Sequence, residues 1–293
     1  MVGMAEDATW ITAPMLAWHD PAARRLPWRT TTEPYAVLVS EIMAQQTQAT
    51  RAGQSWTGFM RRFPTLADLA RAPGAAVIDA WQGLGYNRRA VNLHRCAQVV
   101  VAEHGGCLPD DLAGLEALPG IGPYTARAVL AFAHDRDVVP VDTNVARVLA
   151  RTGDVVLTRP RAQAVADSLP GPGAGGARLS GALMDLGATV CTARQPRCGE
   201  CPLQQRCGWA GGPGPDPAAA GDHRPRRQAA FAGSARQSRG RIVAALRAGP
   251  VPTPQALLLA GDHGQALLDR LVADGLAEPT GGGFALPGYG GMD

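Results

Sequence analysis

Hydrophobic residues recur at helical spacing over most of the chain from Thr12 to Ala188, and prolines and glycines interrupt the pattern at intervals. Apolar residues three or four positions apart share one face of a helix, whereas a strand would alternate apolar and polar residues. Almost no such alternation occurs in this region, so the pattern predicts an all-α domain. Helices are predicted from Pro34 onward and over 87–104, 123–134, 143–151 and 179–189.

The composition changes at Ala210. Residues 210–233 are rich in Gly, Pro and Ala, which predicts a flexible linker over 210–234 after a first domain over 1–209. The linker contains a basic run over 223–227, which is either simply solvated or lies as an arm along phosphates.

The last part of the chain combines helical patterns over 236–248, 253–260 and 264–274 with a glycine-rich stretch over 281–288. The glycine-rich stretch is typical of a β-hairpin. Three helices and a hairpin are the pattern of winged-helix modules, which bind DNA or another protein. We therefore expect a small winged-helix-like module over 235–290.

The positive charge of the chain consists entirely of arginine. The net charge of +3 and the isoelectric point of about 8.6 allow a polyanionic partner without requiring one. Because none of the 28 basic residues is lysine, no side-chain amine can form a Schiff base. No stretch approaches the roughly 18–20 apolar residues of a membrane span, and residues 1–14 do not resemble a signal peptide. We expect a soluble, cytoplasmic protein with no membrane partner.

Four of the six cysteines lie in one short loop over 191–207, whereas Cys96 and Cys107 stand apart and are interpreted as ordinary small residues. The spacing in the loop is Cys191-x6-Cys198-x2-Cys201-x5-Cys207. A cytoplasmic protein rarely uses disulfides, so the thiolates are expected to bind a metal centre. Structural zinc sites usually have two close cysteine pairs, and this loop has one. The spacing therefore favours a [4Fe–4S] cluster over zinc, with a structural role.

A second motif, over 118–126, joins two predicted helices through a tight turn. Gly120 and Gly122 bracket the turn, and Pro123 begins the following helix. Glycines let the backbone approach a phosphate closely, and the free N–H groups of a helix N-terminus can donate to it. A plain helix–turn–helix connection is the alternative, but the Gly-x-Gly-Pro spacing favours phosphate binding.

Two carboxylates, Asp142 and Glu41, each have both a structural and a chemical interpretation. Asp142 follows the apolar run 138–141 at the start of a predicted helix, where it could cap the helix or lie beside a developing cation. Glu41 lies among apolar residues in 37–43, where burial would favour its protonated form and suit it to act as an acid. Taken singly, each carboxylate has an adequate structural explanation.

A series of short motifs runs through the chain in a characteristic order. They are 26–29 (Leu-Pro-Trp-Arg), 40–48 (Ser-Glu-Ile-Met-Ala-Gln-Gln-Thr-Gln), 81–86 (Trp-Gln-Gly-Leu-Gly-Tyr), the hairpin over 118–126, 141–145 (Val-Asp-Thr-Asn-Val), 182–188 (Ala-Leu-Met-Asp-Leu-Gly-Ala) and the cysteine loop. In this order they resemble the adenine DNA glycosylases, a family of the endonuclease III superfamily of helix–hairpin–helix glycosylases. The resemblance covers about residues 12–209 and implies that fold, with a [4Fe–4S] cluster on the four loop cysteines.

The resemblance implies a reaction that begins when a nucleotide is flipped out of the duplex. Glu41 would protonate the adenine, and Asp142 would stabilise the oxocarbenium-like sugar or shield it during attack by water. Tyr124 and Asn144 would hold Asp142 in place. Strand-cutting relatives have a lysine where this chain has Tyr124, so the resemblance and the absence of lysine both imply a monofunctional glycosylase.

The resemblance also assigns residues to the flipped base and to the surrounding DNA. The base pocket would be lined by Trp28, Arg29, Ala44 and Asp185. The DNA would be contacted by Gln45, Gln46, Thr47, Leu84, Gly85, Tyr86, Gly120 and Gly122. Among these, Gln46 and Tyr86 match positions that wedge into the duplex. The implied partner is double-stranded DNA with a mismatch or lesion, bound by a monomer.

Departures from the family's pattern bear on which base is removed. Ala44 and Ala49 replace larger aliphatic residues, which would widen an apolar pocket, and Asn87 replaces an aromatic residue. The long C-terminal domain with which many members recognise 8-oxoguanine is not expected here, since the pattern over 235–290 is that of a winged-helix module. The run Gln45-Gln46-Thr47 still favours adenine mispaired with 8-oxoguanine or guanine. The alternatives are a glycosylase for mismatched thymine or uracil or another damaged base, and a non-catalytic DNA-binding protein.

Overall fold

The computed structural model describes residues 9–169, 175–222 and 230–291. Contacts between Cα atoms divide the chain into two compact units. The first comprises residues 1–38, 110–116 and 121–226, and the second comprises residues 39–109, 117–120 and 227–293. No helix among the described residues is long and apolar enough to cross a membrane.

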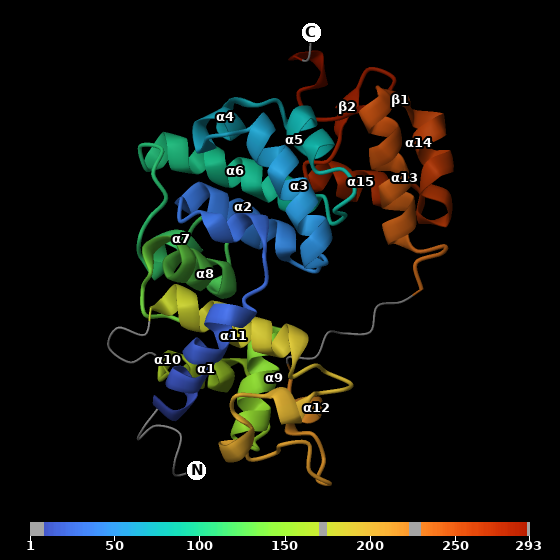
Figure 1. The fold of residues 1–293 in the computed structure, drawn as a ribbon. Helices are drawn as coiled ribbons and strands as arrows, with labels where there is room; N and C mark the ends of the chain where they lie inside the picture. The colour runs from blue at the N-terminus through green and yellow to red at the C-terminus, as the bar shows by residue number, and fades with distance from the viewer. Residues whose placement is uncertain (1–8, 170–174, 223–229, 292–293) are drawn as a thin grey trace. The chain divides into compact units, whose positions relative to one another are not determined.

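The first unit consists of helices and loops throughout its described residues. Helix α11 (Gly176–Thr189) packs against α1 (Thr9–Ala22) and α9 (Thr143–Thr152), and α9 also contacts α10 (Arg159–Asp167) (Figure 1). The other elements are α7 (Leu112–Glu116), α8 (Pro123–His134), α12 (Pro217–Ala220) and the 3-10 turns η1 (Pro27–Thr30), η2 (Cys198–Glu200) and η3 (Gln204–Arg206). Aliphatic side chains at helical spacing form the core, among them Val145, Leu149, Leu179, Leu183 and Leu186.

The second unit begins within α2 (Pro34–Ala44), since the boundary between the units falls after Leu38. It continues through α3 (Ala49–Arg62), α4 (Leu66–Arg71), α5 (Gly74–Ala80) and α6 (Arg88–Glu103). The Phe59 ring makes edge-to-face contacts with the rings of Phe63 and Trp81, at centroid distances of 4.9 and 5.9 Å. The contact with Trp81 joins α3 to the turn that follows α5.

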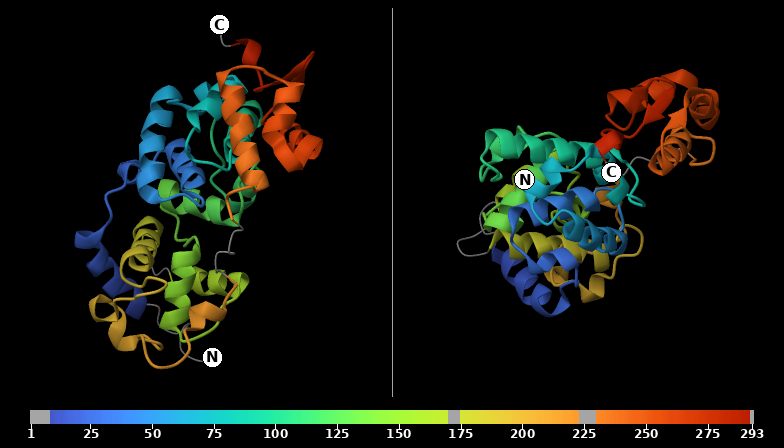
Figure 2. Two further views of the ribbon diagram at one scale, coloured as in Figure 1. Left: turned by 90° about the vertical axis from the view of Figure 1, so that its right-hand side faces the viewer. Right: turned by 90° about the horizontal axis from the view of Figure 1, so that it is seen from above.

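The C-terminal residues of the second unit form three helices and a small antiparallel sheet. The helices α13 (Ala235–Ala248), α14 (Thr253–Ala260) and α15 (Gly264–Ala273) pack together (Figure 2). Strand β3 (Gly283–Ala285) lies between β1 (Val251–Pro252) and β2 (Glu278–Thr280), and two 3-10 turns, η4 (Gly261–His263) and η5 (Tyr289–Gly291), complete the region. A Cβ atom at position 283 would lie 2.1 Å from the carbonyl oxygen of Val251, so the close pairing of β3 with β1 requires glycine there.

These C-terminal elements share a hydrophobic core with α5 and α6. The core joins Ala75, Ile78 and Val91 to buried residues such as Leu246 and Leu271. Two polar contacts reinforce it: the Ala75 N–H donates to the carbonyl of Pro287 at 2.7 Å, and Arg247 donates to the carbonyl of Ile78 at 2.9 Å. The expected separation into domains over 1–209 and 235–290 stays a prediction. The two compact units have other boundaries, and the C-terminal helices belong to the same unit as α5 and α6.

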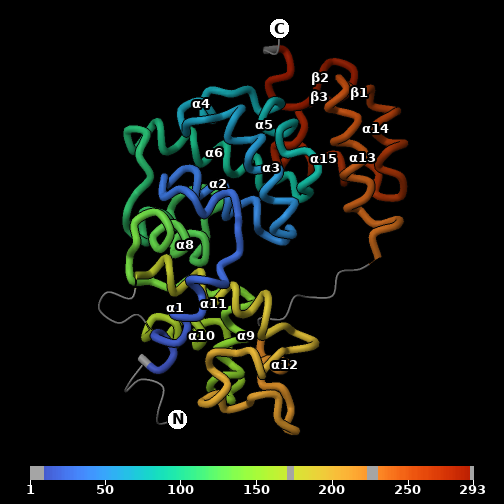
Figure 3. The backbone as a smooth tube through the Cα atoms, viewed as in Figure 1, coloured from blue at the N-terminus to red at the C-terminus, as the bar shows by residue number. Residues whose placement is uncertain are grey.

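Part of the expected linker is ordered. Asp216 caps α12 by accepting from the Ala218 N–H, and the chain from Gly208 to α12 runs along α9 (Figure 3). The flexible-linker prediction therefore does not describe residues 210–222, because Asp216 also pairs with a buried arginine of α9. The basic run over 223–227 lies outside the described residues.

The helix predictions agree closely with the structure. The predicted all-α character of residues 12–188 is confirmed wherever they are described, and the helix over 123–134 has the predicted bounds. The largest difference is at α11, which begins at Gly176 instead of Leu179. The extra turn contains Gly176, Ala177 and Arg178, which carry no apolar periodicity that could have revealed it.

Candidate functional site

Asp142 is held in one orientation at the N-terminus of α9. Its Oδ1 accepts hydrogen bonds from the backbone N–H groups of Asn144 and Val145 at 2.8 and 2.7 Å. Its Oδ2 accepts from the side-chain amide of Asn144 at 2.9 Å. The positive end of the helix dipole adds to the stabilisation of the carboxylate. The capping and the chemical interpretations of Asp142 are therefore compatible, since the cap fixes the position of the charge.

A chain of hydrogen bonds connects Asp142 to the cysteine loop through Asn144 and Arg147. Arg147 Nη2 donates to Asn144 Oδ1 at 2.8 Å, and Arg147 Nε donates to the carbonyl oxygen of Cys191 at 2.8 Å. This route needs α9 and α11 to lie close together, and Gly187 permits it. A Cβ atom there would lie 2.6 Å from Asn144 Cβ.

Gly120, Gly122 and Tyr124 of the hairpin have different structural roles. Gly120 has a φ of 79°, and a Cβ atom there would lie 2.6 Å from the Cβ of Asn92, so the turn needs glycine for two reasons. Gly122 is the N-cap residue of α8 and has no side chain to cap its first N–H groups. Tyr124, the second residue of α8, is half-buried and lies in the same unit as Asp142.

Asp185 lies on α11, completely buried among basic groups. His19 Nε2 lies 3.2 Å from it, Arg24 Nε donates at 2.5 Å, and Arg29 donates with both terminal nitrogens at 2.6 and 2.8 Å. Burial of the carboxylate raises its pKa, but the hydrogen bonds from His19, Arg29 and the Arg24 N–H outweigh burial and hold the pKa well below its usual range. This network anchors η1, which carries the half-buried Trp28, to α11.

Glu41 lies on the part of α2 that belongs to the second unit, and only 9% of its surface is exposed. Ala44 is the last residue of α2, and both it and Ala49, the first residue of α3, are half-buried. Glu41 and Asp142 belong to different units.

Two loops of the second unit carry the residues predicted to contact DNA. One follows α2 with Gln45, Gln46 and Thr47, and the other precedes α6 with Leu84, Gly85 and Tyr86. Leu84 is buried, whereas 44% of the surface of Tyr86 is exposed.

Arg89 and three arginines of the first unit were missed by sequence reasoning. Arg89, in the first turn of α6, hydrogen-bonds to both of the loops that are predicted to contact DNA, and burial lowers its pKa to about 10. The others are Arg24, Arg147 and Arg151. Arg147 and Arg151 are four residues apart, so they lie on one face of the helix, beside the core residues Val148 and Leu149. Two arginines beside an apolar face were the sequence signal that could have identified them.

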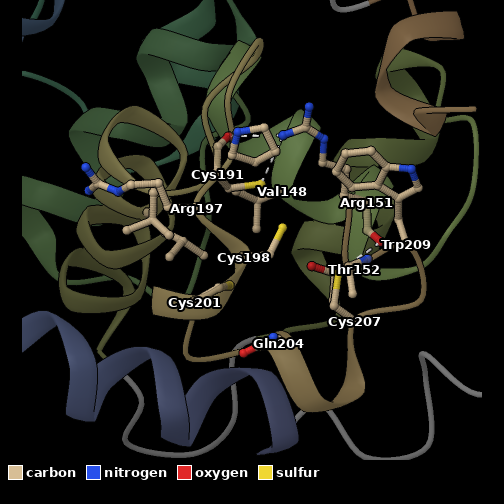
Figure 4. Close-up of a pocket in the computed structure, with 14 residues that line it drawn as sticks. Val148, Arg151, Thr152, Cys191, Arg197, Cys198, Cys201, Gln204, Cys207 and Trp209 are labelled. Carbon is tan, nitrogen blue, oxygen red and sulfur yellow. Dashed lines mark hydrogen bonds between the residues drawn. The ribbon is translucent and has the colours of Figure 1, made fainter. Parts of the chain in front are cut away.

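The four loop cysteines line one cavity in the first unit, and Figure 4 shows their sulfur atoms around a common space. They surround this space instead of converging on one point, and the described residues hold no group of three His, Cys, Asp or Glu side chains suited to a single metal ion. A [4Fe–4S] cubane is larger than a zinc ion, so this arrangement of thiols fits the cluster.

Positive and polar groups beside the cavity complement thiolate ligands. Arg151 is almost completely buried, and its Nη1 lies 3.4 Å from Cys191 Sγ, while the Ala210 N–H donates to Cys207 Sγ at 3.3 Å. Arg151 is held by Asp216, to which it donates at 3.1 and 2.7 Å, and it stacks 4.5 Å from the ring centroid of Trp209 (Figure 4). Such groups orient ligands and neutralise their charge.

Two family models match the chain. The model of the HhH-GPD superfamily base excision DNA repair proteins matches residues 39–166, and that of the iron-sulfur binding domain of endonuclease III matches residues 191–207. The cysteine loop is therefore an iron–sulfur segment, and the zinc alternative is set aside.

Solved structures show the same fold. A thermostable thymine-DNA glycosylase superposes with a TM-score of 0.63 at 26% identity, covering 70% of this chain and 96% of that one. An endonuclease III in a non-covalent complex with DNA superposes with a TM-score of 0.61 at 22% identity, covering 72% of this chain and 98% of that one. At that identity the second likeness concerns the fold alone.

Two relatives in sequence cover almost the whole chain, and a third covers about two thirds of it. The adenine DNA glycosylase of Mycobacterium tuberculosis (strain ATCC 25618 / H37Rv) is 45% identical, over 94% of this chain and 93% of that protein. The adenine DNA glycosylase of Mycolicibacterium smegmatis is 43% identical, over 94% and 96%. The adenine DNA glycosylase of Homo sapiens is 39% identical, over 69% of this chain and 39% of that protein. The chain belongs to the adenine DNA glycosylase family, within the HhH-GPD superfamily of base excision repair proteins.

Proposed function

We propose that this protein hydrolyses the N-glycosidic bond of adenine mispaired with 8-oxoguanine or guanine in duplex DNA, and that it leaves the strand intact. The observation that carries this proposal is the Asp142 carboxylate, fixed by three hydrogen bonds at the N-terminus of α9 in a chain of this family. A carboxylate held in this way can stabilise positive charge on a sugar without reorganising during the reaction.

The geometry of Asp142 leaves it free to act. A carboxylate has about four lone-pair sites, and the hydrogen bonds from Asn144 and Val145 use three of them. Two of these bonds are to Oδ1, so Oδ2 retains acceptor capacity for the sugar or for the attacking water. Asn144 is in turn held by Arg147, which supports the proposed role of Asn144 in orienting Asp142.

Glu41 would supply the proton. Its burial on α2 supports a role as general acid, and transfer of its proton to adenine would make the base a better leaving group. With no lysine in the chain and Tyr124 at the position of the strand-cutting nucleophile, the sugar would be attacked by water. Hydrolysis then ends with an abasic site.

The remaining assignments are also proposals. Trp28, Arg29, Ala44 and Asp185 would form or support the base pocket, and the buried ion pairs of Asp185 favour support over direct contact. The two loops would contact the DNA around the flipped nucleotide, with Gln46 and Tyr86 wedged into the duplex. The hairpin glycines Gly120 and Gly122 would contact the DNA backbone. Cys191, Cys198, Cys201 and Cys207 would hold the [4Fe–4S] cluster, which orders their loop when bound. The protein would act as a monomer.

The test is a single-turnover assay on labelled duplexes that carry A opposite 8-oxoguanine, A opposite G, T opposite G and U opposite G, read with and without alkali. We expect breakage of the adenine strands only after alkali, and none in a Glu41→Gln variant that still binds the duplex. Preference for the T or U strands would overturn the assignment of adenine. Breakage without alkali would overturn the monofunctional mechanism, and no release by the parent protein from any duplex would favour a binding protein.

A further inference from the structure

Arg89 joins the two loops that are proposed to contact DNA. Its Nη1 donates to carbonyl oxygens at the end of α2 and in the loop behind it, those of Ile42 at 2.7 Å, Met43 at 3.2 Å and Gln45 at 2.6 Å. Its Nη2 donates to the carbonyl oxygens of Leu84 at 3.2 Å and Gly85 at 3.1 Å and to Thr47 Oγ1 at 3.3 Å. One guanidinium group therefore connects both loops.

The chemistry of this contact suits arginine specifically. Carbonyl groups in the last turn of a helix have no intrahelical donor, and the negative end of the helix dipole attracts a cation. The Arg89 guanidinium also lies 5.4 Å from the Trp81 ring centroid and 5.7 Å from that of Tyr86. The guanidinium is a rigid planar fork whose two terminal nitrogens can each face one loop, whereas the donors of a lysine ammonium all lie on a single nitrogen.

The residues next to these acceptors have strained backbones. Gln46 has a φ of 52° and Tyr86 a φ of 47°, the left-handed region that disfavours residues other than glycine. Such conformations persist only where the surrounding structure holds them. Arg89 holds the peptide group immediately before each strained residue, since Gln45 and Gly85 supply two of its acceptors.

We propose that Arg89 is a positioning residue that fixes Gln46 and Tyr86 in the conformations that engage DNA around the extruded nucleotide. The inference rests on the proposed function and adds the residue that acts through both loops. Its terminal nitrogens are used within the protein, so Arg89 acts without contacting DNA. The same group fixes the end of α2, one turn beyond Glu41.

The test compares Arg89→Met with Arg88→Met, a matched control. Arg88 is the preceding residue of α6, its side chain is 67% exposed, and its ion pair is with Asp274 at 3.4 Å. Both variants lose one positive charge at the same helix end. Amide hydrogen exchange of residues 45–47 and 84–86 is measured in the free proteins, after thermal unfolding has shown each variant to be folded at the assay temperature. We expect faster exchange in both loops for Arg89→Met and unchanged exchange for Arg88→Met.

The second measurement is the ratio of dissociation constants for a fully paired duplex and for one with A opposite 8-oxoguanine. Misplacement of a group by about 1 Å can lower a reaction rate about 100-fold, and we take this factor as the upper bound for the loss of binding discrimination in Arg89→Met. Arg88→Met should leave the ratio unchanged. Fluorescence of 2-aminopurine at the target position should show reduced base extrusion for Arg89→Met alone.

Unchanged loop exchange in Arg89→Met, or an equal loss of discrimination in both variants, would overturn the proposal. Should Arg89→Met not fold, Arg89→Lys replaces it, and full discrimination by Arg89→Lys would equally overturn it, since charge alone would then suffice. The hydrogen-exchange result does not depend on the base removed. A parent protein without preference for the mismatched duplex would therefore count against the proposed function, while loop exchange would still decide the role of Arg89.

Discussion

At the scale of single residues, the Asp142 side chain caps α9 and is also the proposed catalytic carboxylate. Its oxygen atoms accept hydrogen bonds from the first turn of α9, and the proposed chemical role depends on its charge. The two roles can be separated because asparagine is as good an N-cap as aspartate but carries no charge.

Asp142→Asn should therefore keep the stability of the protein and lose the reaction. Unfolding should stay close to the parent, whereas Asp142→Ala should cost about 1 kcal/mol through loss of the cap. The rate constant of base release should fall about 100- to 1000-fold in both variants, as for removal of one electrostatic stabiliser. Thermal unfolding and single-turnover assays check the two parts, and parent-like release by Asp142→Asn would contradict the proposed role of the charge.

Asp185 should make folding depend on pH. Its pKa in the folded protein lies below its usual value, so the ion pairs stabilise the fold fully above the unfolded pKa of about 4 and lose this contribution as pH falls toward the folded pKa. Asp185→Asn leaves Arg24 and Arg29 without their anion and should cost about 3 kcal/mol at neutral pH.

The measurement is urea unfolding of the parent and Asp185→Asn over a range of pH. The difference in free energy of unfolding should be constant from about pH 7 to about pH 5 and should shrink below about pH 4. A difference that grows as the pH falls would contradict this assignment.

At the scale of elements, helix α9 connects Asp142 to the cysteine loop within the first unit. Asp142 caps its first turn, Asn144 and Arg147 extend from that cap to the Cys191 carbonyl, and Arg151 in its last turn reaches the cluster cavity. One helix thus carries both the proposed catalytic carboxylate and the basic groups beside the cysteine loop.

Cys201→Ser should remove the visible absorbance of the iron–sulfur cluster and disorder the loop over 191–207. Base release should fall about 10- to 100-fold, the range seen when support of a metal site is lost. Cys107→Ser is the matched control, since Cys107 is exposed and lies outside the loop, and it should change neither property. Metal analysis completes the test: zinc in place of iron in the parent protein would refute the cluster.

At the scale of the whole molecule, the C-terminal helices are part of the second unit because they share a core with α5 and α6. A tethered module would unfold without affecting α6. A shared core predicts the opposite, because destabilising one side of it also loosens the other.

Leu271→Ala tests this prediction. Leu271 of α15 is completely buried, and its truncation should cost about 2–5 kcal/mol and speed amide exchange in α6 around Val91. Leu258→Ala is the control in the same region, because 81% of the surface of Leu258 is exposed, and it should change stability by less than about 0.5 kcal/mol. Unchanged exchange in α6 for a destabilised Leu271→Ala would indicate an independent module.

The sequence alone determined the helix ends, the buried faces of the helices and the cysteine loop. Helix ends followed from local signals such as Pro123 and Asp142, and helix faces followed from apolar spacing, because both depend on residues close together in the chain. The spacing of the loop cysteines and the order of the motifs were likewise sufficient to predict the cluster and the family.

Only the tertiary structure decided which distant groups meet. Asp185 pairs with Arg24 and Arg29 across more than 150 positions, and Arg89 reaches the end of α2. It also decided that the C-terminal helices share a core with α5 and α6. The reason is physical: propensity, capping and periodicity act over a few residues, whereas a buried charge selects whichever partner the packed fold brings within hydrogen-bonding distance.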